Sequence, residues 1–144
     1  MGEIMTQTPD FADWLAICNL KAAYCRLLDT KDWEAWRQLF TEDCVVDTRP
    51  SGGTLEEGRD GFVDMVSQSL ADAKTAHQIH SPQITVDGDR ADVVWAMQDR
   101  VVKDSFALTG YGHYHETCVR TADGWKIAHQ TLTRLIVEMD GKPA

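Results

Sequence analysis

The period of the hydrophobic pattern changes once along this chain, and that change limits the possible folds more than any other feature. In the first half, apolar residues recur every three or four positions, as in helices that pack on a core. Further along, they alternate with polar residues in four long stretches that predict strands. These stretches cover residues 77–86, 91–103, 108–120 and 125–137. Helices followed by a long antiparallel meander predict an α+β fold, with the helices on one face of the sheet.

Three helices are expected before the long strands. Thr8 is the predicted cap of the first helix, which should end near Asp29, and Asp32 should cap the second. A third helix should begin after Gly58, preceded by a short strand over residues 44–48. The residues expected to face the core from these helices are Ile17, Leu20, Tyr24, Leu27, Leu28, Trp33, Trp36, Leu39, Phe40, Phe62, Met65, Val66 and Leu70.

The size and charge of the chain exclude several classes of function. Its 144 residues suit one domain, spanning 1–144, around a single core. A formal net charge of −9 argues against nucleic acid and anionic membranes as partners, because both attract basic surfaces. No apolar run approaches the roughly 20 residues that cross a bilayer, and the first residues lack the pattern of a signal peptide. With four scattered cysteines, the chain is expected to be cytoplasmic, with reduced thiols.

One acid lies on an otherwise apolar face of the second long strand. By alternation, Asp99 shares its face with Trp95, Met97 and other hydrophobic residues. An ionisable group in such a place is costly unless it is paired or functional. The sequence leaves both interpretations open, since Arg100 or Arg134 could pair with Asp99.

Three further residues are candidates for chemistry. His77 lies on the first long strand, Tyr24 on the apolar stripe of the first helix, and Asp29 just past the end of that helix. Each also has a purely structural interpretation: a hydrogen-bonded sheet histidine, a core aromatic and a turn residue. If Asp29 approaches a ring nitrogen of His77 in a pocket, the imidazole could transfer protons.

A second group of candidates concerns the wall of the pocket. Trp33, Trp95 and Met97 are expected to contribute apolar surface to it. His113 and His115 point to one face of their strand and could line the pocket or hold a metal. No suitably spaced acid and later histidine complete a metal site, so a metal is not expected.

Several segments resemble one known family. They are residues 20–24, 28–33, 76–82 and 95–100, together with the Gly-Arg-Asp-Gly helix start at 58–61 and the closing strand at 123–127. In order and content they resemble the SnoaL-like branch of the nuclear transport factor 2-like superfamily, over about residues 17–137. Within that branch the chain looks closest to the dehydratases that act on bile acids and on scytalone.

The resemblance implies a fold and a site. The fold would be a cystatin-like curved antiparallel sheet packed against three N-terminal helices, with a cone-shaped pocket and no cofactor. The catalytic residues of the bile acid dehydratases would fall on Tyr24, Asp29, His77 and Asp99. Scytalone dehydratase has tyrosines where this chain has Leu28 and Thr48, so its substrate recognition is not expected here.

These observations favour a cofactor-independent lyase that eliminates water or another small leaving group from a cyclic, largely apolar molecule. His77 supported by Asp29, and Tyr24 with Asp99 nearby, would be the proton-transfer groups, and the sequence does not decide which is the base. An isomerase or polyketide-cyclase-like enzyme, or a non-catalytic binding module, could use the same scaffold.

A homo-oligomer is also expected, and the resemblance favours a trimer over a dimer. The residues that alternate with the inward set are unusually apolar for a surface in contact with water. They include Val94, Ala96, Val102, Leu132 and Ile136.

Overall fold

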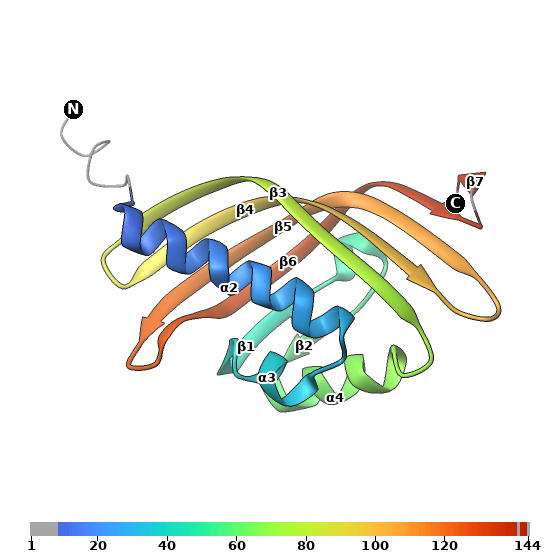
Figure 1. Ribbon diagram of the computed structural model, residues 1–144, viewed down its shortest axis with the longest axis horizontal. Helices are drawn as coiled ribbons and strands as arrows, with labels where there is room; N and C mark the ends of the chain where they lie inside the picture. Colours follow the sequence, from blue (N-terminus) through green and yellow to red (C-terminus); the bar gives the residue numbers. More distant parts are fainter. Residues whose placement is uncertain (1–8, 141, 144) are drawn as a thin grey trace.

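The computed structural model describes residues 9–140 and 142–143 and shows helices on one side of a curved sheet (Figure 1). The chain forms in order α2 (Phe11–Asp29), α3 (Trp33–Arg37), β1 (Phe40–Asp47), a 3-10 turn η1 (Arg49–Ser51), β2 (Leu55–Glu57), α4 (Arg59–Ser69), β3 (Lys74–Asp87), β4 (Arg90–Val102), β5 (Ala107–Thr121), β6 (Gly124–Met139) and β7 (Lys142–Pro143). The predicted α+β class is confirmed.

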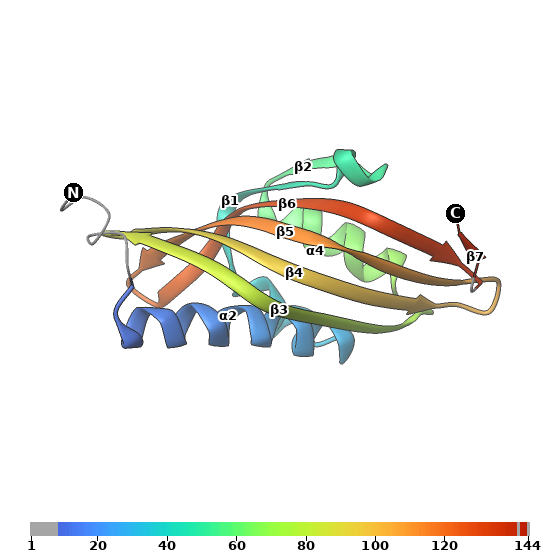
Figure 2. The same ribbon diagram turned by 90° about the horizontal axis from the view of Figure 1, so that it is seen from above.

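The sheet is an antiparallel meander extended at one edge. Its strand order is β2-β1-β6-β5-β4-β3, and β7 pairs with β6. Only the pairing of β1 with β6 is parallel among the described strands. Figure 2 shows α2 running beside β3 along one edge of the curved sheet, with α4 on the same side of the layer. The sheet is curved and does not close on itself. Its concave side faces the helices, and this arrangement leaves room for a cavity.

Local capping residues determine where the helices begin. Asp10 is the cap of α2, because its side chain accepts a hydrogen bond of 2.8 Å from the backbone N–H of Asp13. The cap predicted at Thr8 lies outside the described residues. Asp32 caps α3 as expected, by accepting from the N–H of Ala35. The first helix ends at Asp29, where the sequence placed its end.

Strand β4 keeps one face toward the core along most of its length. Val93, Trp95, Met97 and Asp99 are each exposed by 4% or less, whereas the residues between them are more exposed. The pairing of β4 with β5 has no shift in register. The alternation predicted for this strand is confirmed.

Strand β6 changes its inward face part of the way along. Ile127 pairs with Cys118, but Thr117 pairs with His129, so the register shifts by one residue and Ala128 is the extra residue. Before this bulge odd-numbered residues point inward, and after it Gln130 does. Leu132 therefore packs against the core, and its predicted place on the outer face is wrong.

A second shift in β6 separates Arg134 from Ile136. Arg134 pairs with Gly112 and Ile136 with Tyr111, which leaves Leu135 as the extra residue. Leu135 and Ile136 are 75% and 53% exposed, so Ile136 lies outward as predicted.

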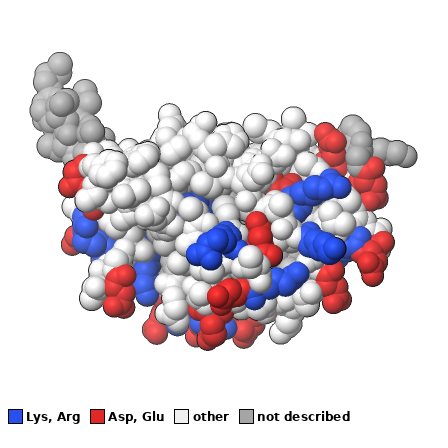
Figure 3. All heavy atoms as spheres, in the orientation of Figure 1, with Lys and Arg blue, Asp and Glu red and all other residues white. Residues whose placement is uncertain are grey.

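The surface carries charged side chains of both signs. On the face in Figure 3, acidic and basic side chains are interspersed, and no broad basic patch gathers there. Among the described helices, none is long and apolar enough to cross a membrane.

Candidate active site

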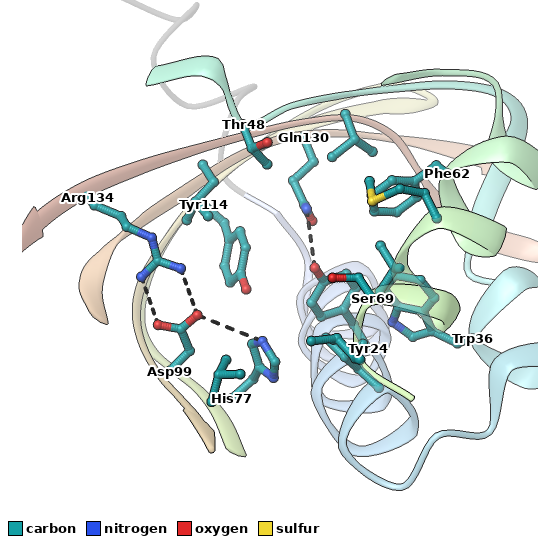
Figure 4. A pocket seen from close by; sticks show the side chains of 17 residues that line it. Tyr24, Trp36, Thr48, Phe62, Ser69, His77, Asp99, Tyr114, Gln130 and Arg134 are labelled. Atoms are coloured by element: carbon teal, nitrogen blue, oxygen red, sulfur yellow. Dashed lines mark hydrogen bonds and ion pairs between the residues drawn. The ribbon is translucent and has the colours of Figure 1, made fainter. Parts of the chain in front are cut away.

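A cavity of about 310 Å³ lies between the concave side of the sheet and the helices (Figure 4). This is near the lower end of the range for small-molecule pockets, roughly 300–1,000 Å³. Its apolar lining consists of Leu28, Trp36, Val46, Phe62, Met65, Val66, Leu70, Val101 and Leu132. Its polar lining consists of Tyr24, Thr48, Ser69, His77, Asp99, Tyr114, Gln130 and Arg134. A few polar groups among apolar walls suit a small, mostly apolar ligand.

Asp29 holds His77 at the edge of this cavity. A ring nitrogen, Nδ1 of His77, lies 2.7 Å from Oδ1 of Asp29, so the expected approach of the two side chains is present. The other carboxylate oxygen accepts the backbone N–H of the same histidine at 2.8 Å, and Thr75 donates its hydroxyl at 2.9 Å. An ionised carboxylate only accepts hydrogen bonds, so Nδ1 carries a proton, and in the neutral form of the ring Nε2 has the free lone pair.

Asp99 lies on the other side of the imidazole. Its Oδ2 is 3.9 Å from Nε2 of His77, which is too long for a hydrogen bond, and the carboxylate attracts the ring only when the imidazole is protonated. Arg134 donates to both oxygens of Asp99 at 2.8 Å. The carboxylate of Asp99 thereby raises the pKa of Arg134. Of the two arginines that the sequence offered as partners, Arg134 is the one used.

Gly110 makes room for this ion pair. It lies directly opposite Asp99 in the sheet. A Cβ atom at this position would come within 1.7 Å of Nη1 of Arg134 and 2.5 Å of Oδ1 of Asp99. A side chain here would therefore displace the guanidinium from the carboxylate.

Tyr24 is a buried residue of the cavity lining. Its hydroxyl oxygen accepts a hydrogen bond of 3.2 Å from Nε2 of Gln130, so its hydrogen-bond partner is this amide and not Asp99. Burial raises the pKa of Tyr24 well above its ordinary value, and the hydrogen bond from Gln130 opposes that rise only in part. Burial also raises the pKa of the neighbouring Tyr114. Both phenols therefore stay protonated at neutral pH.

The five residues predicted to bind substrate do not line this cavity. Trp95 and Met97 point inward but are buried in the core, each 2% exposed. Trp33 lies behind Trp36, against which it packs edge to face with ring centroids 5.8 Å apart. The wall is formed instead by Trp36 and by one side of α4, including Phe62 and Met65.

The other two, His113 and His115, point away from the cavity. They alternate with the buried Tyr114 and so lie on the outer face of the sheet. His115 contacts the hydroxyl of Thr133 at 3.1 Å. Across the described residues, no group of three or more His, Cys, Asp or Glu side chains is arranged to hold a metal ion.

Sequence reasoning missed Tyr114 and Gln130 as lining residues. Tyr114 lies between two histidines that were predicted to line the pocket, and alternation then places Tyr114 on the opposite face of the strand. Gln130 comes inward only because of the bulge at Ala128, which a simple alternation does not predict. A buried amide and a buried phenol in one cavity suggest that this end of it forms hydrogen bonds with a polar group of the ligand.

Comparisons with known proteins agree with this architecture. An uncharacterized protein of Mycobacterium tuberculosis is 27% identical over 141 residues, covering 94% of each chain. A crystal structure from Novosphingobium aromaticivorans, named as a "putative aromatic ring hydroxylase", is 29% identical with a TM-score of 0.87, covering 92% of this chain and 96% of that one. Another from the same organism, named as a "putative scytalone dehydratase", is 24% identical with a TM-score of 0.79, covering 88% and 86%.

The family is shown by a match to its sequence model. The model of the SnoaL-like domain matches residues 9–131, which include α2, the strand that carries His77 and the first part of β6. The chain belongs to the SnoaL-like domain family of the nuclear transport factor 2-like superfamily.

Proposed function

We propose that this protein is a lyase that eliminates water, or a similar small leaving group, from a small cyclic and largely apolar molecule. The observation that carries the proposal is the contact of 2.7 Å between Asp29 and His77 at the edge of the cavity. It leaves Nε2 of the imidazole able to accept a proton, while neutral phenols lie nearby to donate hydrogen bonds (Figure 4).

His77 is the base in this proposal. Nε2 removes a proton from a carbon atom of the ligand, and Asp29 stabilises the imidazolium that forms. Tyr24 is not suited to this role, because its raised pKa keeps the phenol protonated. The sequence left this choice open, and the burial of Tyr24 now favours His77.

The departing oxygen needs a proton to leave as water. A protonated phenol, Tyr24 or Tyr114, supplies it while the carbon–oxygen bond breaks and the carbon–carbon double bond forms. The imidazolium then returns its proton to the phenolate, so both groups end the cycle neutral. Asp99 and Arg134 form a fixed ion pair at 2.8 Å on one side of the imidazole and do not need to change protonation state.

The size of the cavity limits the ligand. About 310 Å³ suits a molecule with one or two rings better than a four-ring steroid. The structural relative named for aromatic ring chemistry supports a ring-containing ligand, although its activity is its own.

The rival is an isomerase, which the pair of neutral phenols would also suit. In that case the phenols would stabilise an enolate, and the proton would return to a different carbon. The two reactions differ in the mass of the product, because an isomerase leaves the mass unchanged. A binding module would give no product at all.

A screen of small cyclic β-hydroxy ketones, with hydroxylated steroids as oversized controls, tests the proposal by mass spectrometry. We expect some of the small compounds to lose one water, and we expect this loss to disappear with His77→Ala. His80→Ala is the matched control, because His80 is on the same strand but exposed. Product formation at the same rate in His77→Ala would contradict the proposal.

A further inference from the structure

A buried lysine lies beneath the polar end of the cavity. Lys21, on α2, is only 1% exposed, and its ammonium group contacts the carboxylate of Glu116 on β5. It also donates to Oε1 of Gln130 on β6 at 3.1 Å. The same nitrogen lies over the rings of Tyr24 and Tyr114, at 3.4 and 3.8 Å from their centroids. Three elements far apart in sequence thus meet around one cation.

The donors and acceptors in this cluster can be assigned in only one order. A lysine ammonium has only donors, so the oxygen of the Gln130 amide must face Lys21. The amide nitrogen must then face the other way, and it donates to the hydroxyl oxygen of Tyr24 at 3.2 Å. Because the oxygen of Tyr24 accepts this hydrogen bond, its own proton is directed elsewhere. The hydroxyl of Tyr114, which acts as a donor toward Tyr24, and the cavity itself lie on the sides that remain, so the proton of Tyr24 is directed to the cavity.

The cost of the cluster points to a role. Burying an ammonium and a carboxylate is expensive, and replacing such a pair by hydrophobic residues is often neutral or stabilising. Apolar side chains could fill this part of the core between α2, β5 and β6 equally well. What they could not do is fix the orientation of the Gln130 amide.

We propose that Lys21 and Gln130 are positioning residues that make Tyr24 a hydrogen-bond donor toward the cavity, so that the ligand meets it with an acceptor oxygen such as a carbonyl. Glu116 keeps the charge of Lys21 balanced in this arrangement. The inference deepens the proposed function, on which its place in the reaction rests. Its binding test needs no turnover.

The test compares two probes that differ by one carbonyl oxygen. 1-Tetralone offers an acceptor, and tetralin has the same two rings without it. The ratio of their dissociation constants is measured by calorimetry for the wild type, Tyr24→Phe, the pair Lys21→Met with Glu116→Met, and all three changes together. Removing both charges at once avoids leaving one of them buried without a partner.

We expect the wild type to prefer the ketone by roughly 2- to 10-fold, the value of one neutral hydrogen bond. Tyr24→Phe should remove this preference. The double variant Lys21→Met with Glu116→Met should remove as much of the preference, although Tyr24 is still present. Adding Tyr24→Phe to that pair should change nothing further.

Three results would overturn the inference. The first is a wild type that does not prefer the ketone. The second is a preference that survives in the double variant of Lys21 and Glu116. The third is an effect of Tyr24→Phe that is equal in the wild type and in this double variant. Loss of water by substrates with no such preference would contradict the positioning role alone. A preference with no turnover of any screened compound would contradict the proposed function alone.

Gln130→Glu keeps the inference testable if the paired variant does not fold. When protonated, the new carboxyl can donate to Tyr24 and accept from Lys21, as the amide does. When ionised it only accepts, so the proton of Tyr24 turns away from the cavity. The ketone preference should be lost where carbon NMR of the labelled carboxyl shows ionisation, and kept where it shows protonation. A preference that ignores this ionisation would overturn the inference.

Discussion

Strands β4 and β6 both supply the cavity, but they do so in different ways. β4 pairs with β5 without any shift, so Trp95, Met97 and Asp99 follow one another on the inward face. β6 contains two register shifts, and only the first brings Gln130 and Arg134 to the inside. A regular strand provides one acid at a fixed place, whereas the bulged strand re-aims its side chains. Substitutions in either strand, or in a residue that contacts it, should therefore have different effects.

The largest expected effect concerns the hairpin of β3 and β4. His77→Ala should lower kcat by about 10²- to 10⁴-fold, because a positioned general base is removed. The measurement is steady-state kinetics on any substrate found in the screen. His80→Ala, on the exposed side of the same strand, should leave kcat unchanged. Equal effects of the two changes would mean that the inward face of β3 has no special part in the reaction.

The next effect concerns the contact between the two strands. Arg134→Met leaves the carboxylate of Asp99, which is 4% exposed, without its partner. Breaking a buried ion pair in this way should lower the free energy of unfolding by about 3–5 kcal/mol, measured by urea denaturation. Arg100→Met removes an exposed arginine from β4 and should cost at most about 0.5 kcal/mol. Similar losses in both variants would show that the Asp99 pair is not a buried one.

A smaller effect tests the space beside that pair. Gly110→Ala should cost about 1–3 kcal/mol of stability, because its Cβ would overlap Arg134 and Asp99. Gly61→Ala is the matched change in α4, where a Cβ meets nothing within 4 Å. It should stabilise the protein by about 0.5–1 kcal/mol, because alanine favours a helix more than glycine does. A Gly110→Ala protein as stable as the wild type would mean that the guanidinium is not fixed.

The smallest effect concerns Tyr24 and pH. Its pKa is raised in the folded protein by burial, whereas the unfolded chain should titrate near about pH 10. The stability from the neutral phenol is complete below that pH and is lost as pH rises toward the folded pKa. Between about pH 10 and 11 this should remove about 1 kcal/mol. Urea denaturation of Tyr24→Phe should show a decline with pH that is shallower by this amount, and an identical decline would contradict the burial of the phenol.

The sequence predicted the regular parts of the molecule well. Capping residues predict that one helix ends near Asp29 and the next begins at Asp32, and alternation predicts the inward face of β4. Both patterns involve only residues close together in the sequence. Leu132 was placed on the wrong face because a bulge depends on the pairing of two strands, which no local pattern contains. The residues predicted to form the pocket wall lie elsewhere for another reason. Alternation predicts that Trp95 faces inward, but it does not predict whether that part of the strand lies beside the cavity or in the packed core.

The candidate site divides in the same way. The resemblance to a family suggested Asp29 and His77 together, and the two side chains lie 2.7 Å apart. The resemblance did not suggest Lys21, Glu116 or Gln130, because their contacts join α2, β5 and β6 across the core. Long-range polar contacts of this kind become visible only in the folded structure.

The central claim is that Asp29 holds His77 with its proton on Nδ1, so that Nε2 can act as the base. Nitrogen NMR of the protein with labelled histidine, assigned by comparison with His77→Ala, measures this directly at mildly alkaline pH. We predict a neutral ring with the proton on Nδ1, and a mixture of both tautomers in Asp29→Asn. A neutral ring with its proton on Nε2, unaffected by Asp29→Asn, would contradict the account.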